Sequence, residues 1–115
     1  MSDKEKFLGE FEQFVLLSIL KLGENAYGST IRQLLADAVE RDVTIGALYT
    51  TLERLEKKGL LTSKVGEVTP ERGGRAKKYF KLTAQGQNAL KRSKEALTNM
   101  WRGLSFSTPN KVCSI

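Results

Sequence analysis

The spacing of apolar residues along this chain changes from a helical period to a strand period and back, and that order limits the fold more than any other feature. Up to Gly59 the apolar side chains recur every three to four residues. Residues 60–68 and 75–82 are typical of strands, and the helical spacing returns after Thr83. The order predicts three helices, a β-hairpin and a final helix.

The first two helices are punctuated by short glycine-containing segments. The first ends at Gly23 and is apolar around most of its circumference, which predicts burial on more than one side. The second follows Tyr27-Gly28, with Ser29 or Thr30 expected as the N-cap. Its apolar stripe consists of Ile31, Leu34, Leu35, Ala38 and Val39.

The third helix is expected to start after Thr44 as N-cap and to stop at Gly59. Its core stripe is Leu48, Leu52 and Leu55, with Ile45 one turn earlier. The opposite face is small and polar at its start and basic at its end: Ala47, Thr50, Thr51, Arg54 and Lys58.

The strand segments flank a loop that contains Pro70 and Gly73-Gly74. On the second strand Phe80 and Leu82 point one way, whereas Arg75, Lys77, Tyr79 and Lys81 alternate to the other side. Thr83 is expected to cap a last helix over residues 84–103.

This order is that of a winged helix-turn-helix, so the expected fold class is mainly α with a β-hairpin. We expect a winged-helix DNA-binding domain over residues 1–83 and a C-terminal dimerisation helix over residues 84–104. Residues 105–115 are expected to form a disordered tail.

The charge is divided unevenly along the chain. Residues 1–42 carry five Lys/Arg against eight Asp/Glu, and the remainder carries fourteen against five. Eight of the basic residues lie between Lys57 and Lys81. This excess indicates a face for a polyanion, although a solvated charged surface is the ordinary alternative.

The reactive side chains argue against catalysis. There is no histidine, and the single cysteine, Cys113, is interpreted as an incidental thiol near the C-terminus. No phosphate-binding glycine loop is found, so we expect neither an enzyme, nor a cofactor, nor a metal site. No segment is long and apolar enough for a membrane, no secretory signal is seen at the N-terminus, and a cytoplasmic location is expected.

The third helix and the hairpin suit double-stranded DNA on chemical grounds. Small side chains at Gly46, Ala47 and Thr50 allow close approach to base edges. Basic residues around the Gly73-Gly74 tip can contact phosphates, which gives affinity with little sequence choice. These hairpin residues are Arg72, Arg75, Lys77 and Lys78.

Three ordered motifs carry a resemblance to a known family. They are Leu48-Tyr-Thr-Thr-Leu-Glu-Arg-Leu-Glu-Lys-Lys-Gly-Leu60, Gly74-Arg-Ala-Lys-Lys-Tyr79 and Leu82-Thr-Ala-Gln-Gly86. Together they resemble the PadR family of bacterial transcriptional regulators, in its short form with one C-terminal helix. The resemblance covers about residues 7–104 and implies a homodimeric repressor of a pseudo-palindromic operator.

The resemblance also implies site residues. Tyr27 and Tyr49 would lie near phosphates, although Tyr49 could instead be a packing residue. Arg54 could bind DNA or pair with Glu53 or Glu56 within its helix. The expected DNA-binding set is Tyr27, Ser29, Thr44, Gly46, Ala47, Tyr49, Thr50, Arg54, Arg72, Gly73, Gly74, Arg75, Lys77 and Lys78.

The last helix has a short heptad seam that needs a surface to lie on. It could pack on its own domain or form a dimer interface, and the resemblance favours the dimer. The expected interface set is Phe7, Phe11, Leu90, Leu97, Met100, Trp101 and Leu104. Trp101 is either an interface anchor or the stacking partner of a small aromatic effector.

Two other functions compete with an operator-binding regulator. A basic winged helix can bind RNA or other nucleic acid without operator specificity. A winged helix can also serve as a protein–protein adaptor. The basic hairpin and the small-residue face of the third helix argue against the adaptor.

Overall fold

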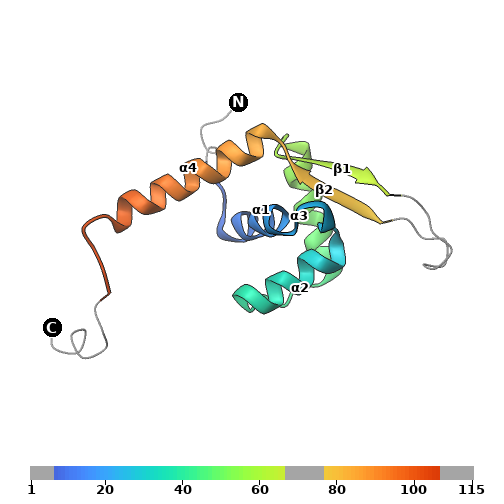
Figure 1. Ribbon diagram of the computed structural model, residues 1–115, viewed down its shortest axis with the longest axis horizontal. Helices are drawn as coiled ribbons and strands as arrows, with labels where there is room; N and C mark the ends of the chain where they lie inside the picture. Colours follow the sequence, from blue (N-terminus) through green and yellow to red (C-terminus); the bar gives the residue numbers. More distant parts are fainter. Residues whose placement is uncertain (1–6, 67–76, 107–115) are drawn as a thin grey trace.

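The computed structural model describes residues 7–66 and 77–106, and Figure 1 shows the arrangement of their elements. The predicted order of three helices, a hairpin and a final helix is confirmed. Arg72, Gly73, Gly74, Arg75 and Cys113 lie outside the described residues. The elements are α1 (Glu10–Leu22), the short 3-10 helix η2 (Gly23–Asn25), α2 (Gly28–Val39), α3 (Ile45–Lys57), β1 (Leu61–Val65), β2 (Lys78–Leu82) and α4 (Ala84–Trp101).

The ends of α3 follow the expected cap chemistry. The Ala47 N–H donates to the Thr44 hydroxyl oxygen at 3.1 Å, so Thr44 is the N-cap. Just beyond its end, Gly59 has a φ of +82°, a left-handed conformation that glycine adopts without strain. Both expectations for this helix are confirmed.

The prediction of Ser29 or Thr30 as the N-cap of α2 is wrong. The cap is Tyr27, and the helix begins at Gly28. Thr30 lies three residues after the cap, where its side chain can reach back to accept the Tyr27 N–H at 3.0 Å. The same hydroxyl therefore satisfies a backbone donor at the helix start, but from inside the helix.

The core lies where α1 and α3 pack against the hairpin and α2 packs on these two helices. The predicted stripe of Leu48, Leu52 and Leu55 is fully buried. Thr51 was expected on the opposite face, but it is only 6% exposed because it completes the spacing of that stripe. Ile45 was expected in the core and is 44% exposed, since it is the first residue of α3.

Two other burial predictions fail for geometric reasons. Of the predicted stripe of α2, only Ile31 and Leu35 are fully buried, and Ala38 in the last turn is exposed. In α1, Leu17 and Leu20 are exposed on the side opposite Val15 and Ile19. Within a single chain α1 therefore packs against α2, α3, α4 and β2, and the strip that carries Leu17 and Leu20 is left uncovered.

The hairpin is antiparallel, and the backbone of residues 26–27 pairs with its strand β2. Leu61 pairs with Leu82, and Phe80 and Leu82 point into the core as predicted. The Phe80 N–H donates to the Ala26 carbonyl at 2.9 Å, and Tyr27 forms a bridge with Tyr79. The hydrogen bonds hold the start of α2 directly beside β2.

The helix α4 divides into a packed half and a projecting half. Gly86, Ala89, Leu90 and Ser93 are buried, and the first half packs on α1. The second half runs away from the other elements, on the side opposite β1 and β2 (Figure 1). Packing on its own domain therefore accounts for the first half of α4 only.

Candidate nucleic-acid interface

The first turns of α3 present a small and exposed surface. Gly46, Ala47 and Thr50 are all exposed, and a Cβ on Gly46 would meet no atom within 4 Å. The Thr50 hydroxyl donates to the Gly46 carbonyl at 3.0 Å, so its oxygen lone pairs remain able to accept a hydrogen bond. This part of the helix can approach a flat or grooved partner closely.

Tyr49 joins the start of α3 to two neighbouring elements. Its ring centroid is 6.1 Å from that of Phe80 in β2. Its hydroxyl lies against Gly28, where a Cβ would stand 2.8 Å from the oxygen. The ring is thus a packing group, and the polar end lies at the N-terminus of α2.

Tyr27, Tyr79 and Lys77 form a cluster between the start of β2 and the start of α2. The two tyrosine rings meet edge to face with centroids 5.4 Å apart. The Lys77 ammonium lies 3.8 Å from the centroid of the Tyr27 ring, within cation–π range. The cluster positions one basic hairpin residue next to the start of α2, where Ser29 is exposed.

Tyr79 was not among the predicted site residues, although the alternation of β2 had placed it on the side of Lys77 and Lys81. The Tyr79 ring also packs closely on Gly66, just after β1, where a Cβ would lie 2.8 Å from the ring. Lys78 is half-buried on the other side of the strand, with its ammonium 5.9 Å from the Phe80 ring centroid.

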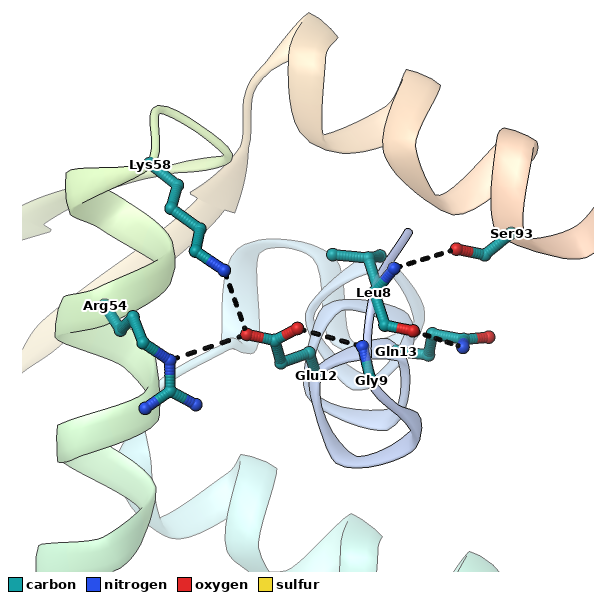
Figure 2. Close-up of polar contacts among 7 residues, drawn as sticks. All are labelled: Leu8, Gly9, Glu12, Gln13, Arg54, Lys58 and Ser93. Atoms are coloured by element: carbon teal, nitrogen blue, oxygen red, sulfur yellow. Dashed lines mark hydrogen bonds and ion pairs between the residues drawn. The ribbon is translucent and has the colours of Figure 1, made fainter. Parts of the chain in front are cut away.

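At the C-terminal end of α3, the side chains of Arg54 and Lys58 face α1 (Figure 2). The Glu12 Oε2 atom lies 3.5 Å from the Arg54 Nε and 3.4 Å from the Lys58 Nζ. Both intrahelical partners considered for Arg54 are therefore wrong. Glu56 instead accepts a hydrogen bond from the Ser63 hydroxyl at 2.8 Å.

The electrostatics of this group favour the charged carboxylate. Burial by itself would raise the pKa of Glu12, but the Gly9 N–H bond and the positive charges of Lys58 and Arg54 outweigh it. The pKa of Glu12 consequently lies below its usual value. Sequence reasoning missed Glu12, whose contacts lie more than 40 residues along the chain.

The predicted dimer residues fall into two groups. Leu90 is 8% exposed and packs within its own chain, and Phe11 is half-buried against the same core. Five others are exposed in the single chain, and the Trp101 ring meets Phe106 edge to face at 5.2 Å. The exposed five are Phe7, Leu97, Met100, Trp101 and Leu104.

A groove of about 670 Å³ lies between the end of α1, the hairpin and the start of α4. Leu20, Tyr79, Leu82 and Gln87 are among its walls, and Trp101 is not. Among the described residues there is no cluster of acidic or cysteine side chains that could hold a metal ion. No helix in the described ranges is long and apolar enough to cross a membrane.

A helix-turn-helix made of α2 and α3, followed by a two-stranded hairpin, defines a winged-helix protein. Residues 16–92 match the sequence pattern of the PadR-like family of transcriptional regulators, and this chain belongs to that family. A comparison with curated protein sequences found no match.

Solved structures of similar fold include members of the same family. A PadR-like transcription factor from Bacteroides fragilis is 32% identical over 78% of this chain and 82% of its own, with a TM-score of 0.65. A PadR family regulator from Clostridium difficile is 26% identical over 78% and 90%, with a TM-score of 0.64. A PadR family regulator from Eggerthella lenta is 28% identical over 82% and 81%, with a TM-score of 0.63.

Proposed function

We propose that this protein is a homodimeric repressor that binds a pseudo-palindromic DNA operator. The observation that carries the proposal is the exposed, small-residue surface of Gly46, Ala47 and Thr50, together with Lys77, which lies over the Tyr27 ring just before β2. Such a helix start can enter a major groove, and the hairpin can then lie on the adjacent backbone.

The contacts divide into those that position the protein and those that select sequence. Thr44, Gly46, Ala47 and Thr50 are proposed to meet base edges, where methyl groups and hydroxyls distinguish bases. A second set of residues, at the start of α2, at Tyr49 in α3 and in the hairpin, is proposed to contact phosphates. This phosphate set is Tyr27, Ser29, Tyr49, Arg72, Gly73, Gly74, Arg75, Lys77 and Lys78.

The dimer is proposed to form through the projecting half of α4 together with Phe7 and Phe11. Leu97 and Met100 in α4 and Leu104 just beyond its end are exposed large apolar side chains, and burying them against a second copy would remove that surface from water. A two-fold axis through this contact would present two α3 helices to half-sites about one helical turn apart.

Repression is proposed to be relieved by a small aromatic compound that stacks on Trp101 in the dimer. Exposure of the indole in the single chain supports access to this residue. Titration of the tryptophan fluorescence with simple aromatic compounds, followed by competition with operator DNA, tests the idea. Quenching without release of DNA would leave Trp101 as an interface anchor.

Selection of bound sequences from a random duplex pool tests the main proposal, at about 150 mM salt to suppress phosphate-only binding. An inverted repeat is the expected product, because a dimer reads two identical half-sites. Only salt-sensitive binding without sequence preference would refute operator recognition and favour a general nucleic-acid-binding winged helix. Single-stranded and duplex RNA serve as competitors that separate those outcomes.

A further inference from the structure

The N-terminus of α1 is held by both of the helices that flank it in space (Figure 2). The Gly9 N–H donates to the Glu12 Oε1 atom at 3.0 Å, which satisfies a donor at the helix start. The Leu8 N–H donates to the Ser93 hydroxyl oxygen of α4 at 3.4 Å, and the Leu8 carbonyl accepts from the Gln13 amide at 3.1 Å. Glu12 therefore sits on a fixed piece of backbone.

The second carboxylate oxygen of Glu12 faces two cations of α3. Arg54 and Lys58 are four residues apart and so lie on the same face of the helix. The Glu12 side chain is only 13% exposed, whereas those of Arg54 and Lys58 are 51% and 30% exposed. The Glu12 carboxylate is therefore largely enclosed by protein, whereas the Arg54 and Lys58 side chains that pair with it remain partly exposed to solvent.

These cations continue the exposed side of α3 that starts at Ala47 and Thr50. Without the Glu12 carboxylate, this arginine and lysine would be able to bind DNA phosphates beside the surface that is proposed to contact bases. Such contacts strengthen binding to every sequence alike. A carboxylate that holds them removes part of that sequence-independent attraction and leaves the small residues at the helix start unaffected.

We propose that Glu12 is a specificity-determining residue that holds Arg54 and Lys58 on α1 and so limits the binding of α3 to non-operator DNA. The proposal rests on the function proposed above. Glu12 is a positioning residue in this role, because it acts through two side chains of the neighbouring helix and does not itself touch DNA. It assigns Arg54 to restraint of non-specific binding and not to operator contact.

The test compares the wild type with Glu12→Gln on the selected operator and on a duplex of random sequence, from about 50 to 300 mM salt. The glutamine keeps an acceptor for the Gly9 N–H but loses the charge that holds the cations. We expect the salt slope on random DNA to steepen by about one to two units, since every further phosphate that is neutralised adds about 0.9. The ratio of operator to random affinity should fall accordingly.

Glu10→Gln is the matched control, because it makes the same change in net charge in the same turn of α1. The partner of Glu10 is Arg41, just beyond the end of α2, and not a cation of α3. Equal salt slopes for Glu12→Gln and Glu10→Gln would overturn the proposal, because the effect would then be one of net charge alone.

A second pair of variants keeps the test valid if Glu12→Gln is poorly folded. Arg54→Gln with Lys58→Gln in the wild-type background should leave the salt slope almost unchanged, because these cations are already held by Glu12. A salt slope that falls by about two units would show that Arg54 and Lys58 already contact phosphates in the wild type, and this would refute the proposal. Where the fold is kept, the same pair should reverse the effect of Glu12→Gln.

Failure of the proposed function gives a different result. In that case the wild type itself selects no operator, whatever the variants do on random DNA. Recovery of an operator by the wild type, with no difference between the two glutamate variants, would reject the role of Glu12 alone.

Discussion

The hydroxyl of Tyr49 lies so close to Gly28 that a methyl group on that glycine would stand 2.8 Å from the oxygen. The contact sets the spacing between the start of α2 and the start of α3. Tyr49 cannot retreat freely, because its ring packs on Phe80 behind it. The distance between the two helix ends that are proposed to face DNA thus depends on the absence of a side chain at Gly28.

We expect Gly28→Ala to displace Tyr49 and to lower the stability by about 1–2 kcal/mol, the usual cost of overpacking. Operator affinity should fall further than stability explains, because both helix ends move. Urea unfolding and DNA titration of the same samples measure the two effects. Tyr49→Phe in the alanine background removes the nearest atom and should recover part of the lost stability; no recovery in urea unfolding would mean that this contact is not the cause.

Gly86→Ala is expected to be the most damaging of the glycine substitutions. A Cβ there would lie 2.2 Å from the backbone carbonyl oxygen of Leu60, which also accepts the Thr83 N–H. Backbone would have to move, so we expect a loss of about 3 kcal/mol in the free energy of unfolding. Gly46→Ala, in open space, is the control and should change stability by less than about 1 kcal/mol. Similar unfolding midpoints for both variants would contradict the close approach.

The features that sequence could predict are local ones. Thr44 and Thr83 were predicted as caps because a cap needs only its own next three residues, and both bonds are present. The stripe of Leu48, Leu52 and Leu55 follows from helical geometry alone. Thr51 lies three residues after Leu48 and four before Leu55, so the same helical spacing would have placed it in the core, where it is buried.

The parts of the site that sequence could not predict depend on contacts between distant segments. Glu12 looked like an ordinary acidic residue in a first helical turn, and Lys58 like an ordinary basic one in a last turn. Only the packing of α1 against α3 brings them to 3.4 Å. The meeting of Tyr27 with Tyr79 likewise required the backbone pairing of residue 27 with β2.

Lys77→Ala is expected to weaken DNA binding by the same factor on operator and random duplexes. The residue is held on the Tyr27 ring and is proposed to contact a phosphate, so the salt slope should fall by about one unit. Fluorescence anisotropy at several salt concentrations gives both quantities. Lys94→Ala, at an exposed position of α4, is the control for charge. An unaltered slope in Lys77→Ala would show that Lys77 does not contact phosphates.

Leu97→Asp should yield folded monomers, because Leu97 is 57% exposed and has little packing to lose within its own chain. Burying an unpaired carboxylate in the proposed interface would oppose association. Light scattering reports the mass, and circular dichroism reports the fold. Leu90→Ala is the contrast: it should cost about 2–5 kcal/mol of folding stability, because that side chain is in the core. A Leu97→Asp dimer of undiminished stability would place the interface elsewhere.

The low pKa of Glu12 makes part of the folding stability dependent on pH. Because the folded pKa lies below the unfolded value of about 4.3, the contribution is fully present at neutral pH. It is lost as the pH falls through about 4.3 and then through the folded pKa, where both states bind the proton. Glu12→Gln should therefore be less stable than the wild type at pH 7, by about 1 kcal/mol, and the gap should close as the pH falls below the folded pKa of Glu12. Urea unfolding across that range measures the gap, and a gap that stays constant would show that the carboxylate charge contributes nothing to holding α1 against α3.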